Sequence, residues 1–391
     1  MSTMLLSRFG LLRMSGRDPH EAHRVASPLE LFFDLVFVIA VSQASQQLHH
    51  GIVAGHAMTT TLSYAMIFFA IWWAWMNFTW FASAFDTDDW LYRVTTIVQM
   101  GGVLVVAAGV HDAMANGDWA TVTWGYVIMR LAMVTQWLRV AVSDPELRAV
   151  ALRYAFGITF VQGIWLARIS FSADIQFWSF WPAMVLELLV PVFAERARNT
   201  PWHPHHIAER YSLFVLILLG ESLLASANAI IDALNSGDHV EGILRLAISG
   251  LVLAAGVWWL YFSHEYGDRL NSASSGFGFG YAHYLLFASV GAISAGIEVE
   301  LDLLTGAADH LSARSASLAF AVPVAVFMFV VWLILLRIRL SPAASIVCLV
   351  ATGAVIVCAM LPIVTVLGAA ICVAIAVAST EVHRVRHRNI V

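Results

Sequence analysis

Apolar runs long enough to cross a membrane recur along nearly the whole chain. A helix of about 20 apolar residues spans the roughly 30 Å of hydrocarbon in a bilayer. With 60% hydrophobic and only 12% charged residues, the composition excludes an ordinary soluble domain. We therefore predict an all-α, polytopic membrane bundle of about twelve transmembrane helices, centred near Val38, Phe69, Val103, Met129, Phe160, Leu186, Leu216, Val252, Ser289, Val326, Val350 and Ala370.

The last two runs are separated only by Leu361-Pro362. Because so short a connection also suits a kinked, re-entrant pair, both interpretations of these two segments stay open.

The arginines predict which way the bundle faces. All 21 basic residues are Arg, and assigning alternate connections to each side puts about 17 of them with the termini and about 3 on the other side. Both termini are therefore expected in the cytoplasm, in a bacterial cytoplasmic membrane. Residues 1–26 lack the apolar stretch and cleavage site of a signal peptide, and the basic tail is too short to indicate nucleic-acid binding.

Several features reappear after a shift of about 186 residues. Trp72-Trp73 falls on Trp258-Trp259, and Gly109 falls one position from Gly296. With an even number of helices each, two such repeats are parallel, and a site is expected at their interface. We predict a cytoplasmic segment 1–26, a first six-helix repeat 27–196, a connector 197–205, a second repeat 206–380 and a basic cytoplasmic tail 381–391.

Two carboxylic acids lie within apolar runs, where a charged side chain costs roughly 3 kcal/mol or more and usually marks a function. Asp34 lies in the first run and Glu221 in the seventh. Ser27 suits a helix N-cap, and Glu30 complements the positive helix end, so capping explains Glu30. Capping does not explain Asp34, which lies one turn deeper on the same face.

The seventh run opens with a second group of polar residues, His206, Glu209 and Arg210, eleven to fifteen residues before Glu221. At 1.5 Å per residue these groups cannot reach Glu221, but they mark two depths along one helix. We predict an ion or substrate pathway that includes Glu30, Asp34, His206, Glu209, Arg210 and Glu221.

Arg130 and Glu187 are further charges at mid-membrane depth. Opposite charges in hydrocarbon tend to pair, so we predict an intramembrane ion pair between them, with Asp34 as a competing partner for Arg130. Such a pair serves either as a structural link between helices or as a functional gate.

No motif indicates a cofactor or a metal. The histidines lack the spacing of a metal or haem site, and the glycine-rich segment 275–280 lacks the lysine of a phosphate loop. We therefore expect neither group.

The stretch Glu30-Leu-Phe-Phe-Asp34, together with His206, Glu209-Arg210 and Leu219-Gly220-Glu221, resembles the bacterial low temperature requirement A family. That resemblance covers nearly the full length and implies a multi-spanning membrane protein, without assigning roles to these residues. More remotely, the duplicated six-helix units and the aromatic-Asp motif are similar to endolysosomal potassium channels, whose Phe-Ser-Asp motif has Ser where this chain has Phe33.

Titratable groups at several depths favour a transporter or ion-conducting protein, acting on an unknown ion or small molecule. A membrane-embedded enzyme or cofactor- or lipid-binding protein is the first alternative, with the Trp-rich helices as its pocket; catalysis is less favoured than transport. A structural stress-adaptation protein is the second. The lipid bilayer is the expected environment, and the sequence leaves a homo-oligomer open.

Overall fold

The computed structural model describes residues 10–21, 24–236, 240–264, 266–270, 272–308 and 310–388. The predicted N-terminal segment 1–26 and tail 381–391 therefore lie partly outside the described residues. The described part of the chain contains α-helices and no strand, which confirms the predicted all-α bundle.

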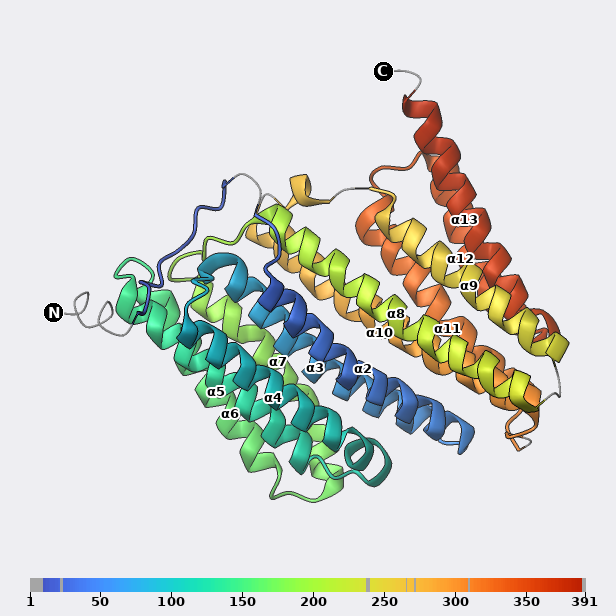
Figure 1. Cartoon of the computed structure of the whole chain (residues 1–391), viewed down its shortest axis with the longest axis horizontal. Helices are drawn as coiled ribbons and strands as arrows, with labels where there is room; N and C mark the ends of the chain where they lie inside the picture. The colour runs from blue at the N-terminus through green and yellow to red at the C-terminus, as the bar shows by residue number, and fades with distance from the viewer. Residues whose placement is uncertain are drawn as a thin grey trace. The chain divides into compact units, whose positions relative to one another are not determined.

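Helices α2 to α13 cover the twelve predicted centres, one helix for each (Figure 1). Their bounds are α2 Pro28–Val53, α3 Ala57–Phe85, α4 Trp90–His111, α5 Ala120–Ser143, α6 Arg148–Arg168, α7 Ala173–Glu195, α8 Pro204–Ser236, α9 Val240–Phe262, α10 Ala273–Thr305, α11 Ala313–Val331, α12 Pro342–Cys358 and α13 Thr365–Arg388. Short π-helical turns, η1 (Asp112–Asn116) and η3 (Trp332–Leu336), extend α4 and α11. Single 3-10 turns, η2 (Gly267–Arg269) and η4 (Pro362–Val364), precede α10 and α13.

Ten helices in the described part are long and apolar enough to span a membrane. The two others are α5, whose apolar run is interrupted by Arg130, Gln136 and Arg139, and α12, which has 17 residues. At 1.5 Å per residue, α12 is about 25 Å long, which is short for a full crossing.

The chain forms two compact units. Unit 1 comprises residues 1–43 and 66–210, and unit 2 comprises residues 44–65 and 211–391. In unit 1, α4 packs on α5, α5 on α6, and α6 on α7; in unit 2, α10 packs on α11, α11 on α12, and α13 on both α12 and α9 (Figure 1).

Two glycines allow a close helix contact in unit 1. A Cβ at Gly102 of α4 would lie 2.8 Å from the carbonyl oxygen of Gly125 in α5, and one at Gly125 would lie 2.6 Å from the backbone nitrogen of Val106. Only residues without a side chain allow two backbones to approach so closely, as in membrane helices that associate through small residues.

Asp89 ties three segments of unit 1 together. Its carboxylate caps α4 by accepting from the N–H of Tyr92, at 3.0 Å, and accepts from the N–H of Leu12, also at 3.0 Å. The Arg139 guanidinium of α5 contacts both carboxylate oxygens, with Nη1 2.9 Å from Oδ1. Burial raises the pKa of Asp89, but the hydrogen bonds from Arg139, Tyr92 and Leu12 outweigh it and leave this pKa below its ordinary value.

We expect Asp89→Asn to lower the unfolding free energy by about 1–3 kcal/mol, because a helix cap and a charge-assisted bond are lost together. Since the folded pKa of Asp89 is depressed, its contribution is complete above the unfolded pKa of about 3.9 and disappears as pH falls through the folded value. The melting temperatures of both proteins in detergent, measured between pH 7 and pH 3, should therefore approach each other as the pH falls.

Asp88→Asn is the matched control for this prediction. Asp88 pairs with Arg93 at 2.8 Å, but both side chains are more than half exposed, so its loss should leave the melting temperature nearly unchanged. Equal melting of wild type and Asp89→Asn at neutral pH would contradict the anchoring role of Asp89.

Candidate functional site: a buried charge cluster in unit 1

The first turn of α2 is closed by a reciprocal cap. The Ser27 N–H donates to Oε2 of Glu30 at 2.7 Å, and the Glu30 N–H donates to the Ser27 hydroxyl at 3.4 Å. This is the capping-box geometry that the Ser-Pro-Leu-Glu sequence predicts. It uses one carboxylate oxygen of Glu30 and leaves Oε1 facing the interior of unit 1.

Two residues of α8 meet the acids of α2. Nη1 of Arg210 lies 2.9 Å from Oε1 of Glu30, and Nη2 lies 2.5 Å from Oδ1 of Asp34. Nε2 of His206 lies 3.0 Å from the same Glu30 oxygen. The i,i+4 spacing on each helix places Glu30 above Asp34 on α2 and His206 above Arg210 on α8, so the two pairs face each other. All four side chains are fully buried.

Three further polar groups complete the cluster. The indole N–H of Trp75 in α3 donates to Oδ1 of Asp34 at 2.7 Å. Arg24, in the segment before α2, lies 3.8 Å from Glu30 and 3.5 Å from Asp86, the residue that follows α3. Burial, and then the neighbouring Glu30 carboxylate, raise the pKa of Asp86 above its ordinary value.

The cluster contains more acids than permanent cations. The carboxyl groups of Glu30, Asp34 and Asp86 face the guanidinium groups of Arg24 and Arg210, and only His206 can supply a third positive charge. A net charge without water nearby is costly, so a neutral cluster requires one proton, either on His206 or on a carboxyl group.

Several buried atoms of the cluster have no hydrogen-bond partner among the described residues. Besides the atoms that form ion pairs, they include Oδ2 of Asp34, Nδ1 of His206 and Nε of Arg210. Buried polar atoms are nearly always paired, and exceptions concentrate where a site takes up a proton or a polar ligand.

The remaining predicted pathway residues lie elsewhere. Glu209 is half-buried and accepts from the Ala26 N–H at 3.3 Å, so it belongs to the rim of the cluster. Glu221 lies further along α8, in unit 2. Gly220, beside Glu221, does not mark a close helix contact, because a Cβ there would meet open space.

Glu221 belongs to a second group of titratable residues, within unit 2. His49 of α2 bridges two acids of α10, with Nδ1 3.2 Å from Glu298 and Nε2 2.7 Å from Asp302. Glu298 is within electrostatic range of Glu221. The i,i+4 spacing of Glu298 and Asp302 was a signal for this group, whereas the participation of His49 depends on packing.

Arg130 and Glu187 form a second buried charged group in unit 1. Of the two acids weighed for Arg130, the structure places Glu187 beside it, with Nη2 3.0 Å from Oε2. Glu187 also accepts from Trp73 at 2.9 Å, Gln162 at 2.9 Å and Trp165 at 3.1 Å. Four donors from α3, α5 and α6 therefore converge on one carboxylate of α7, so this group connects four helices.

Sequence reasoning did not identify Trp75, Arg24 or Asp86 as parts of the site. Arg24 and Asp86 look like ordinary charges at the end of a membrane helix, and Trp75 lies among several tryptophans of α3. Within the part of the chain that the structure describes, no group of three or more His, Cys, Asp or Glu side chains is arranged to hold a metal ion.

The model of the bacterial low temperature requirement A protein family matches residues 25–380. The chain belongs to this family. It is also 27% identical over 266 residues to an uncharacterized protein of Rhizobium meliloti (strain 1021), and the match covers 61% of this chain and 58% of that protein. The chain thus spans little more than half the length of this relative. No solved structure matches the chain.

We expect removal of Glu187 alone to destabilise this low temperature requirement A protein more than removal of both partners. Glu187→Gln leaves the Arg130 guanidinium buried without a counter-charge, at a cost of about 3–5 kcal/mol, whereas Arg130→Met combined with Glu187→Gln removes both charges. Melting temperatures of the two single variants and the double variant form the test. Fully additive effects would show that the two residues do not interact.

Proposed function

We propose that this family member transports protons, alone or coupled to another ion or small solute, through a route that includes the buried cluster of α2 and α8. The observation that carries the proposal is the charge balance of that cluster, in which three carboxyl groups face two arginines and one histidine. A site that needs one proton to be neutral gains and loses that proton as its surroundings change.

The geometry gives the proton two places to bind. His206 lies 3.0 Å from Glu30, and Oδ2 of Asp34 has no hydrogen-bond partner among the described residues. Arg210 contacts both acids, so protonation of either one frees the guanidinium to bind the other more closely. Titration of one side chain is in this way coupled to the packing of α2 against α8 within unit 1.

Other charged or titratable groups surround the cluster and take part in its titration. They come from the N-terminal segment, the start of α4 and the region where α8 begins, and they are Glu21, Tyr92, His203 and Glu209.

We also propose the predicted duplication, with residues 27–196 and 206–380 as its halves. In each unit a tryptophan donates to a glutamate across equivalent helices: Trp73 of α3 to Glu187 of α7, and Trp259 of α9 to Glu381 of α13 at 2.8 Å. Gly109 of α4 and Gly296 of α10 both lie where a Cβ would come within 2.8 Å of the next helix. These parallels support a common ancestor for the two halves.

We expect Asp34→Asn to abolish pH-dependent proton flux while preserving the fold. The variant leaves two acids facing two arginines, so the cluster is neutral without an exchangeable proton, and the carbonyl oxygen of the introduced amide can still accept from Trp75. Purified protein in liposomes containing a pH-sensitive dye, subjected to a pH step, measures the flux. At least a tenfold decrease with an unchanged melting temperature is the expected result.

Glu146→Gln is the matched control, because Glu146 is an exposed acid that pairs only with Arg198, at 2.8 Å, and should transport as wild type does. Glu221→Gln tests the second titratable group in the same assay and is expected to lose the pH dependence as well. Wild-type flux and pH profile in Asp34→Asn would show that the cluster only holds helices together.

We further propose that both termini lie in the cytoplasm and that the membrane is the bacterial cytoplasmic membrane, on the strength of the arginine distribution. In a background lacking the three native cysteines, Asn199→Cys in the exposed connector between α7 and α8 should react only from the cytoplasmic side. Asn116→Cys, exposed between α4 and α5, should react only from outside. The reverse pattern would invert the topology.

A further inference from the structure

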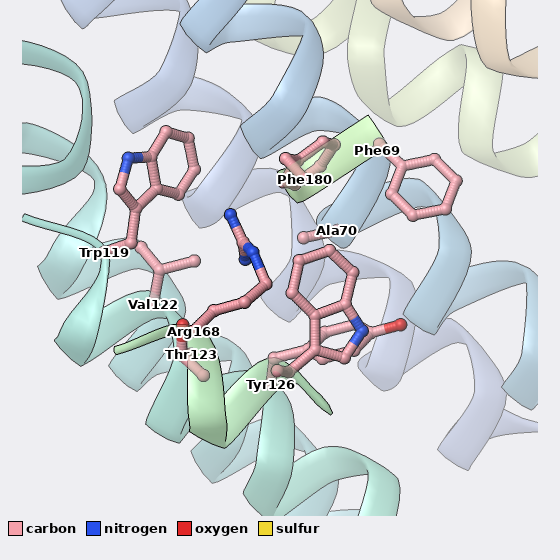
Figure 2. Close-up of a pocket in the computed structure, with 9 residues that line it drawn as sticks. Phe69, Ala70, Trp119, Val122, Thr123, Tyr126, Arg168 and Phe180 are labelled. Carbon is pink, nitrogen blue, oxygen red and sulfur yellow. The ribbon is translucent and has the colours of Figure 1, made fainter. Parts of the chain in front are cut away.

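A small cavity lies within unit 1, where α3, α5, α6 and α7 meet. Its volume is about 20 Å³, and the walls include the rings of Phe69, Trp119, Tyr126 and Phe180. The Arg168 side chain extends from the end of α6 into the space between these rings (Figure 2). The wall also contains the hydroxyl-bearing Thr123 but no carboxylate.

Arg168 is held in place without a negative charge. Nε donates to the Ser179 hydroxyl at 2.9 Å, and Nη2 donates to the carbonyl of Gln176. The guanidinium carbon lies 4.6 Å from the centre of the Trp165 ring and 5.6 Å from that of Phe180.

This arrangement distinguishes Arg168 from the other buried arginines that the structure describes. Arg24, Arg130 and Arg210 each have a carboxylate within 4.0 Å, whereas Arg168, only 3% exposed, has none. Arg168 is also the last residue of α6, at the helix end that the proposed topology puts opposite the termini, where positive residues are disfavoured. Cation–π contacts offset only part of the cost of a buried charge.

We propose that the cavity binds one small inorganic monoanion, of about the size of chloride, with Arg168 as its counter-charge. A cavity of about 20 Å³ exceeds the roughly 10–15 Å³ needed for one water molecule, so an ion of similar size fits, while a lipid headgroup or an organic acid does not. The Thr123 hydroxyl and the electropositive edges of the aromatic rings supply further favourable contacts.

The test measures melting temperatures of the purified full-length protein in detergent, with sodium chloride or sodium bromide replacing sodium gluconate at constant ionic strength. Because an anion that binds the folded state stabilises it, both halides should raise the melting temperature along a saturable curve. Arg168→Gln should weaken the apparent halide affinity at least tenfold.

Arg153→Gln is the matched control. Arg153 lies on the same helix, its guanidinium carbon lies 5.4 Å from the centre of the Phe193 ring, and it donates to the Phe193 carbonyl at 3.4 Å, so its loss should leave the halide response intact. Ala70→Leu fills the cavity while keeping Arg168 and should also remove the response. If Arg168→Gln does not fold, the halide response of Ala70→Leu tests the proposal on its own.

Equal melting of the wild type in chloride and gluconate would mean that the cavity holds water only, and the proposal would be wrong. A wild-type halide response in Ala70→Leu or in Arg168→Gln would place the anion elsewhere and would also overturn it. Neither result bears on the proton-transport proposal, because Arg168 contacts no member of the α2–α8 cluster among the contacts of the described residues.

Discussion

A guanidinium group surrounded by apolar helices requires a partner, and this requirement organises unit 1. Water is not available to solvate it, and the cost of an unpaired charge exceeds that of most packing defects. Arg210 therefore holds α2 to α8 through Glu30 and Asp34, and Arg130 helps to hold α5 to α7 through Glu187. Each ion pair fixes the rotation of two helices, which uniform apolar surfaces would leave undetermined.

The α2–α8 cluster and the Arg130–Glu187 group differ in how completely their charges and hydrogen bonds are satisfied. Glu187 receives four hydrogen-bond donors and faces a single arginine, so its charge is balanced. The α2–α8 cluster has an excess acid and buried polar atoms without partners among the described residues. A group with equal numbers of opposite charges suits a structural link between helices. A cluster with an excess acid and a histidine suits the gain and loss of a proton.

Several parts of the site could be predicted from the sequence because they depend on local geometry. The Ser27–Glu30 cap follows from spacing on one helical turn, and the shared faces of Glu30 with Asp34 and of His206 with Arg210 follow from the helical repeat. Trp75, Arg24 and Asp86 could not be predicted, because their participation depends on how α3 and the N-terminal segment pack. The surroundings of Gly220 also depend on packing, since a small residue permits a close helix contact without requiring one.

The sequence by itself determined the twelve helices, their order and the presence of charges that an apolar bundle must accommodate, because length and hydropathy act within each segment. Only the tertiary structure decided which charges meet: Arg130 lies beside Glu187, His49 lies between Glu298 and Asp302, and Arg168 has no carboxylate within 4.0 Å among the described residues. Pairing depends on the rotation and depth of each helix. These are set by the contacts of all its neighbours together, and no single segment of sequence encodes them.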